Sequence, residues 1–531
     1  MRFPIRQFCI SLLTAVAAAN AEAVHISANG TGQVLLFPYY TVRNGFATIL
    51  SVINTQNNTK IVKVRFLEGM NGREVSSFNL FLAPNDTWTT AVVETANGAR
   101  IITNDNSCVT PSDLFTETRR VSGGQLPSQF LNEFFNFRYA GNRQDNPAFS
   151  TLDRTREGYF EVIEMGVIDP ALSVTAAQIV GYAKPRGVSS TTYNCAALDS
   201  FDSLSNSPRG ILFPNTGAAM MVPPRGGLKG RASLINAANG ANYSFAPTTL
   251  DGWSSQIAYS PAGDASGTLL RDAFPATSMV TTTVGIVTSR WANGRDAVSA
   301  VLMRESLINE YVLDTGTVSQ TDWVATFPTK PFYTDPLVVV ANTGTRAPFS
   351  GTFSSTGTTG CDGYSPAQVN RDGNPDVLGI IFPGVRLPIP VGSVQASEFC
   401  RTANVVPFLA TTTEQRFGQS SLLSTATPSQ LGFYTYLYMG NSTSTPSTTT
   451  TPSLSAIQGP NGWLSMFFNG AQQQLEPLFA TLTSPSGAQV IIHGTHFGLP
   501  MIGFMLHNYK NASVESRYGG VVEHAYFVRV E

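Results

Sequence analysis

The sequence predicts a mainly β protein: two β-sandwich domains, immunoglobulin-like or jelly-roll-like, with a few short covering helices. Apolar residues alternate along many short segments, turn-forming pairs such as Asn44-Gly45 separate them, and helical periodicity is confined to two places. The pattern is clearest near the start, where five strand-like segments follow one another: 32–42, 46–54, 60–68, 74–82 and 87–93. Short strands at such regular spacing are typical of a sandwich or barrel.

The segment Lys60–Glu68 illustrates the strand pattern. Val62 and Val64 alternate with Lys63 and Arg65, and successive side chains of a strand point to opposite faces. We therefore expect this strand to bury one face and to expose the other to water.

The later chain predicts further strands and two helices. Strands are expected at 158–168 and 176–183 and at several segments after residue 335. Phenylalanines at helical spacing predict a first helix near 128–137, and Asp296 is expected to cap a second helix, Ala297–Val312.

At 531 residues the chain exceeds one ordinary core. We expect a signal peptide at 1–23, an N-terminal sandwich with helical insertions at 24–325, and a C-terminal sandwich at 326–531. The prolines of 322–335 suggest the junction, and the Ser/Thr/Pro-rich tract 441–453 is expected to be an exposed loop.

The first residues predict export. Arg2 and Arg6 precede a short apolar segment, 8–19, and small residues flank two candidate cleavage sites, of which Ala21-Glu22-Ala23 would leave Val24 first. The apolar segment is too short to span a membrane, and no later segment is long enough. The expected location is the cell surface or the extracellular space, with the periplasm as the alternative.

The charge composition of the chain limits which classes of partner are expected. Only 13% of residues are charged and the net charge is −2, with no basic block. Neither nucleic acid nor an anionic membrane surface is an expected partner.

Four cysteines follow the predicted signal peptide, and an even number in an exported chain suggests disulfides. They are Cys108, Cys195, Cys361 and Cys400. Three pairings are possible; Cys108–Cys195 with Cys361–Cys400 is the simplest.

Two sets of residues are candidate metal ligands. Oxygen side chains at alternate positions of a glycine-containing turn could hold a structural calcium ion, although the bidentate glutamate of such loops is missing and an ordinary turn is the alternative. These residues are Asn370, Asp372, Asn374 and Asp376, with Asp362 nearby. Four histidines near the C-terminus could bind zinc or copper, the alternative being separate hydrogen-bonded groups. They are His493, His496, His507 and His524.

One candidate glycan or partner surface and no catalytic motif were found. Tyr434, Tyr436 and Tyr438 share one face of a predicted strand, which suits stacking on sugar rings if exposed and intersheet packing if buried. Glu161 and Glu164 do not form a catalytic pair, because three residues apart on a strand they point to opposite faces.

Several segments resemble those of a family of exported proteobacterial proteins without an assigned activity. They are GQVLLFPYYTVRNG at 32–45, VKVRFLEGMNGREVSSFNLFL at 62–82, GYFEVIEMG at 158–166, NEYVLDTGTVSQTDWVATFPTKPFY at 309–333, and FGLPMIGF at 497–504 with YGG at 518–520. The resemblance implies export and a shared β-rich fold, and it transfers no functional residue.

The sequence favours a non-catalytic, exported structural or adhesive protein that acts through β-sandwich surfaces and possibly self-assembles, with a cell-surface or polysaccharide partner. The alternatives are a secreted hydrolase with a site between the two domains, and a metal- or glycan-binding periplasmic protein.

Overall fold

The computed structural model describes most of the chain after the predicted signal peptide. The described residues are 23–115, 134, 151–184, 193–202, 220–262, 264, 268–314, 316–338, 347–353, 360–370, 397–409, 422–423, 437–439, 456–457, 461–510 and 517–531. Three predictions lie outside them: the signal peptide up to residue 22, the tract 441–453, and the first helix apart from Phe134.

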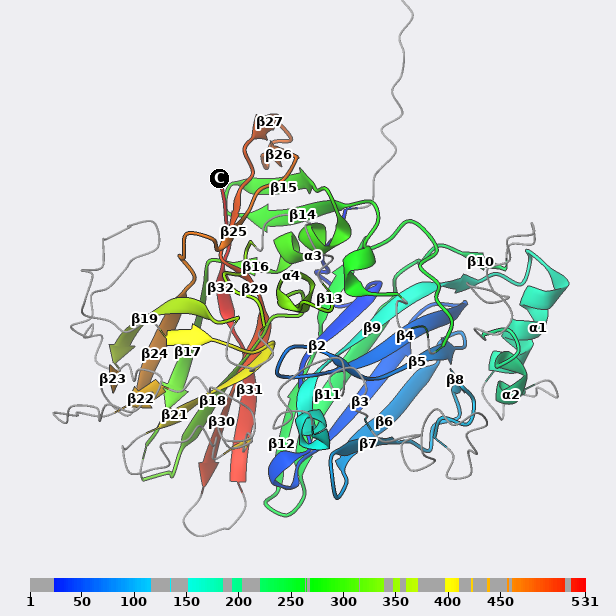
Figure 1. Ribbon diagram of the computed structural model, residues 1–531, viewed down its shortest axis with the longest axis horizontal. Helices are drawn as coiled ribbons and strands as arrows, with labels where there is room; N and C mark the ends of the chain where they lie inside the picture. Colours follow the sequence, from blue (N-terminus) through cyan, green and yellow to red (C-terminus); the bar gives the residue numbers. More distant parts are fainter. Residues whose placement is uncertain are drawn as a thin grey trace, which may run out of the picture.

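The protein is mainly β, as predicted, with several antiparallel sheets and few short helices (Figure 1). All five opening segments are strands: β2 (Val34–Thr41), β3 (Ala47–Asn54), β4 (Thr59–Glu68), β5 (Glu74–Leu82) and β6 (Thr87–Glu94). The immunoglobulin-like or jelly-roll-like arrangement stays a prediction.

The first half contains two sheets. The larger has the order β1-β13-β2-β9-β4-β5-β8, with β10 beside β9. Its further strands are β1 (His25–Ile26), β8 (Cys108–Thr110), β9 (Glu157–Ile168), β10 (Met221–Val222) and β13 (Thr248–Asp251). The smaller has the order β12-β11-β3-β6-β7, with β7 (Ala99–Ile102), β11 (Leu228–Asn236) and β12 (Ala241–Phe245). One buried apolar cluster draws residues from both sheets, including Phe37 of β2 and Val52 of β3.

Two further sheets form most of the second half. One has the order β20-β19-β24-β17-β32, with β17 (Ser306–Val312), β19 (Asp362–Asn370), β20 (Ser397–Phe399), β24 (Asn461–Phe467) and β32 (Ala525–Phe527). The other has the order β23-β22-β21-β18-β30-β31. Its strands are β18 (Gln320–Thr326), β21 (Ala403–Leu409), β22 (Leu437–Met439), β23 (Ala456–Ile457), β30 (Ile502–Lys510) and β31 (Arg517–Glu523).

Three small sheets complete the described part of the fold. The four-stranded one, β14-β15-β26-β27, lies at one end of the molecule (Figure 1). It consists of β14 (Thr277–Thr282), β15 (Gly285–Arg290), β26 (Phe479–Thr483) and β27 (Gln489–Ile492). The others are β16 (Met303–Arg304) with β29 (Leu499–Pro500), and β28 (His496–Phe497) between β25 (Gln474–Leu475) and β33 (Arg529–Val530).

Strand pairing crosses residue 325, where the sequence suggests a domain boundary. Strands β15 and β17 precede it and β18 contains it, and these three strands pair with β26, β24 and β30, which follow it. The segment 277–326 is therefore hydrogen-bonded to the C-terminal strands.

The α-helices within the described residues are α1 (Val174–Ala183), α2 (Cys195–Leu198), α3 (Gly294–Leu302) and α4 (Pro331–Thr334). The strand prediction for 176–183 was wrong: Ser173 accepts a hydrogen bond from the Ala176 backbone N–H and so caps a helix. The second predicted helix is capped by Asn293 rather than Asp296 and ends at Leu302. Its expected second half is β17, because residues 306–312 pair with β24.

Strand β4 also departs from the prediction, because both of its faces are buried. Lys63 and Arg65, expected in water, are 2% and 7% exposed. Among the described residues, no helix has the length and apolar character needed to cross a membrane.

Candidate functional site

The two disulfides form with the simplest pairing. Cys108 at the start of β8 bonds to Cys195 at the start of α2, and Cys361 bonds to Cys400. Each closes a long loop, of 87 and 39 residues of sequence separation, which restricts the unfolded chain.

The predicted calcium ligands divide between described and undescribed parts of the chain. Asp372, Asn374 and Asp376 lie outside the described residues, and Asn370 is described only as the last residue of β19. Asp362 is buried and forms an ion pair with Lys330, with 2.9 Å between Oδ2 and Nζ. It also accepts hydrogen bonds from the backbone N–H and the hydroxyl of Ser350. The Lys330 ammonium thus already neutralises the Asp362 carboxylate.

The four histidines have separate surroundings. His507, on β30, is half-buried and its ring lies beside that of Tyr509. His493 is exposed, whereas the buried His496 hydrogen-bonds Ser289 through Nε2 at 3.2 Å. The buried His524 hydrogen-bonds Asn309 through Nδ1 and the Val324 carbonyl through Nε2. The described residues contain no group of three or more His, Cys, Asp or Glu side chains placed to hold a metal ion.

Burial lowers the pKa of both His496 and His524 to about 4, with one backbone hydrogen bond opposing the shift in each. Both rings are therefore neutral near pH 7. The tyrosine surface is not described: Tyr434 and Tyr436 lie outside the described residues, and of Tyr438 only its place in β22 is known.

A buried network of charged side chains lies where the first half of the chain meets the second. We call it the junction network, and its members are Arg43, Glu68, Arg73, Asp153, Arg154, Glu157, Asp335 and Arg401. Glu68, at the end of β4, is fully buried and accepts hydrogen bonds from the backbone N–H groups of Met70 and Arg73 at 2.7 and 2.9 Å. Its Oε1 also lies 3.0 Å from Nη2 of Arg154. Burial alone would raise the pKa of Glu68, but Arg154 and these N–H groups lower it, so the carboxylate is charged.

Two ion pairs of this network join residues far apart in sequence. Arg73 donates from Nε and Nη2 to the two carboxylate oxygens of Asp335, at 2.8 and 3.2 Å. Nη1 of Arg401 lies 3.6 Å from Oε1 of Glu157. Backbone bonds run alongside, because the Ala403 N–H donates to the Gly69 carbonyl at 2.9 Å. These contacts fix the second half of the chain against the ends of β4 and β9.

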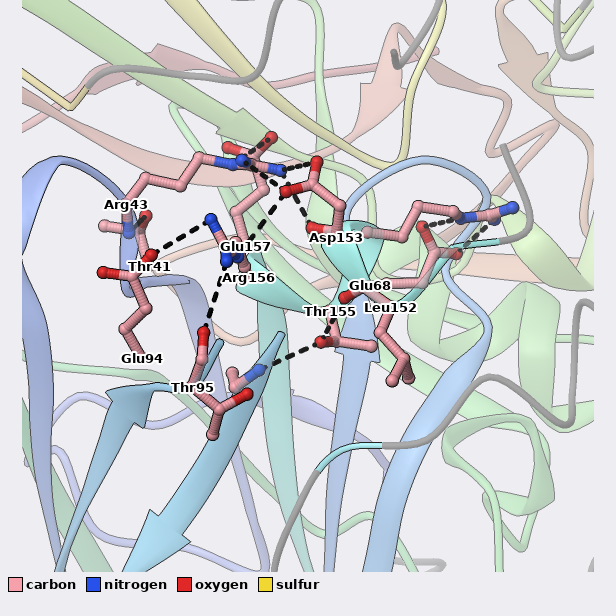
Figure 2. A network of polar contacts seen from close by, with 12 residues as sticks. Thr41, Arg43, Glu68, Glu94, Thr95, Leu152, Asp153, Thr155, Arg156 and Glu157 are labelled. Carbon is pink, nitrogen blue, oxygen red and sulfur yellow. Dashed lines mark hydrogen bonds and ion pairs between the residues drawn. The ribbon is translucent and has the colours of Figure 1, made fainter. Parts of the chain in front are cut away.

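The outer end of the network approaches solvent. Figure 2 shows Arg43, Asp153 and Glu157 pointing toward one another, with Arg156 beside them. Nη2 of Arg43 lies 2.9 Å from Oδ2 of Asp153, whose side chain is 25% exposed. Arg156 pairs at 3.0 Å with Glu94, whose side chain is 45% exposed. The arrangement is one of opposite charges that neutralise one another, which suits the cohesion of the fold.

A second buried polar cluster surrounds Asp202. Its carboxylate accepts hydrogen bonds from Asn79, Thr110 and the Tyr259 hydroxyl. Nearby, burial lowers the pKa of Lys63 to about 8, while Asp202 opposes that shift. The Lys63 ammonium donates to the Pro261 carbonyl at 3.2 Å. This one described hydrogen bond of Lys63 links β4 to the segment that contains Pro261.

A pocket of about 360 Å³ lies beside the first described residues. Its lining includes His25, Gln33, Arg225 and Asp251. Gln33 has a structural role, because its side-chain amide donates a hydrogen bond to the Ser254 carbonyl and accepts one from the Ser254 backbone N–H.

The junction network buries charged side chains, whereas the small sheet β14-β15-β26-β27 exposes apolar ones. Its strand register places Val280, Val287, Leu482 and Val490 in one row on one face. Val280 and Val287 are 6% and 1% exposed, Leu482 is half-buried, and Val490 is 60% exposed. An apolar row that begins in the core thus continues onto an uncovered surface.

Other large apolar side chains are exposed on the opposite face of this sheet, because they alternate along β26 and β27 with the residues of the row. In the hairpin 479–492, which we call the apolar hairpin, Ile491 is 71% and Phe479 49% exposed, and Leu478 just before it is 69% exposed. Residues 273–289 and 477–509 contain no Asp, Glu, Lys or Arg, so Arg290 is the sheet's one charged residue. Exposed apolar side chains gathered at one place in this way are typical of interaction sites.

The sequence missed this surface. One of the strands that the sequence predicts after residue 335 is AQVIIHG, 488–494, but an apolar run of this length is usually buried. The long uncharged stretch 477–509 is the signal that could have singled it out.

Comparisons of the chain with protein-family models, curated proteins and solved structures find no match. The resemblance to an exported family stays a prediction.

Proposed function

We propose that this chain is a non-catalytic, exported protein of the cell surface or extracellular matrix that adheres to a partner through a β-sheet surface. The observation that carries the proposal is the apolar row that leaves the core at Val287 and ends uncovered at Val490. Burying one such side chain is worth about 1.5–3 kcal/mol, so an uncovered group of them favours association with another surface.

Two further features support it. Disulfides persist in oxidising compartments, and both pairs form here. The ion pairs of the junction network join the two halves of the chain, and none of them involves the apolar hairpin. The surface of the hairpin therefore stays available for contact.

The test compares retention of the chain on the cells that produce it. The full chain with its own N-terminal segment is expressed, and its amounts on the cell surface and in the medium are measured. Val490→Lys with Ile491→Lys should release the chain into the medium and lower the surface-bound share at least ~10-fold, since a buried charge costs the contact more than 1.4 kcal/mol. Val174→Lys, at a position 79% exposed on α1, is the matched control and should behave as the parent chain.

Equal retention of the double variant and the parent chain would overturn the proposal. So would recovery of the parent chain inside the cell with the four disulfide-forming cysteines reduced.

A further inference from the structure

The far edge of β27 is open in the part of the chain that the structure describes. The described sheet ends at this strand: β26 pairs with one side of β27 through residues 489–492, and no described strand pairs with the other. An edge strand presents unpaired backbone N–H and C=O groups, and proteins usually protect such an edge with lysine, proline or a bulge. Residues 489–492, Gln-Val-Ile-Ile, contain neither lysine nor proline, and the register of β27 against β26 has no shift.

We propose that the partner of this edge is a second copy of the chain, which pairs β27 with β27 in an antiparallel, two-fold arrangement. The inference rests on the proposed function and names the partner of the same surface. Antiparallel pairing about a two-fold axis keeps the equivalent faces of both copies on the same side. With the axis at Ile491, Val490 would face Ile492 of the second copy, and the uncovered row would continue across the pair.

Charge favours a second copy over a charged partner. The sheet carries one charged residue, Arg290 on β15, which is separated from β27 by β26. A neutral edge neither repels its own copy nor offers the cations that a nucleic acid or an acidic polymer would need. Two-fold pairing also brings Val490 and Ile491 of each copy beside apolar side chains of the other, because the contact uses the same patch twice.

A cysteine at the axis tests the geometry. Ile491→Cys in a Cys9→Ser background introduces one free thiol, because the other four cysteines form the two disulfides. We expect air oxidation of the purified chain to give a covalent dimer that reducing agent reverses. Val174→Cys is equally exposed and should stay monomeric. A monomeric Ile491→Cys chain, or equal dimer formation by both variants, would overturn the proposal.

The oligomeric state of the purified full chain, measured by sedimentation, separates this proposal from the proposed function. Ile491→Lys should weaken self-association at least ~10-fold, because the two lysines would meet across the axis. A chain that is monomeric at all concentrations, but loses surface retention with Ile491→Lys, would overturn the pairing and keep the adhesive function. A chain that pairs through Ile491, but is retained equally with or without that residue, would support the pairing and overturn the adhesive function.

Discussion

The junction network and the apolar hairpin invert the usual distribution of residue types. At the junction, Glu68 and Asp335 are fully buried, whereas in the hairpin Val490 and Ile491 are mostly exposed. The buried charges are each matched by an arginine and by backbone donors, so the fold satisfies them internally. The exposed apolar groups have no such compensation among the described residues. The comparison teaches that charge is used here for cohesion, while the apolar surface is left free for the contact that we propose.

Breaking one charge at the junction should give the largest effect on stability. Glu68→Gln removes a buried carboxylate charge 3.0 Å from the Arg154 guanidinium, and we expect the free energy of unfolding to fall by about 3–5 kcal/mol. The matched control is Glu94→Gln, in the exposed Glu94–Arg156 pair beside the network, which should cost at most about 1 kcal/mol. Urea unfolding followed by tryptophan fluorescence measures both. Equal small effects would mean that the buried pair contributes no more than the exposed one.

Lowering the pH should reduce the stability contributed by buried neutral histidines before it reduces the stability contributed by buried, paired carboxylates. In the folded state burial lowers the pKa of His524 to about 4, against about 6.5 in the unfolded chain. The unfolded state therefore binds more protons between these values, and the stability contributed by His524 is complete above pH 6.5 and declines as the pH falls toward 4. The loss is roughly 3 kcal/mol, and His496 follows the same course.

His524→Gln removes this titration. We expect its free energy of unfolding to depend less on pH between 6.5 and 4 than that of the parent chain, as measured by urea unfolding at a series of pH values. The pKa of Glu68 is lowered instead, so its contribution is present above the ordinary carboxyl range and is lost only at lower pH, as the pH falls through the folded-state pKa. An unchanged slope in His524→Gln would contradict the assignment.

The sequence predicted what depends on local pattern and missed what depends on distant partners. The opening strands follow from alternation and turns, and the disulfides follow from four cysteines in a chain predicted to be exported. The burial of Arg65 does not follow from its neighbours alone, because Glu74 is nine residues away but its other carboxylate partner, Glu161, is 96 residues away. Asp335 likewise reaches Arg73 across 262 residues.

The candidate surface was missed for a related reason. A run such as Val490-Ile491-Ile492 has the composition of a core strand, and only the position of β27 at the end of its sheet leaves it uncovered. The strand prediction at 176–183 was wrong for a local reason. An apolar run alone does not distinguish a strand from a helix, and the cap at Ser173 favours the helix.

Substitutions along the apolar row should locate where the core ends. Val287→Thr places a hydroxyl in the buried part of the row and should cost roughly 1–3 kcal/mol of unfolding free energy. Val490→Thr makes the same change two strands away, where the side chain is 60% exposed, and should cost less than about 0.5 kcal/mol. Urea unfolding of the dilute, dissociated chain measures both. If Val490→Thr cost as much as Val287→Thr, the hairpin would belong to the core of the single chain, and its apolar residues would need no partner.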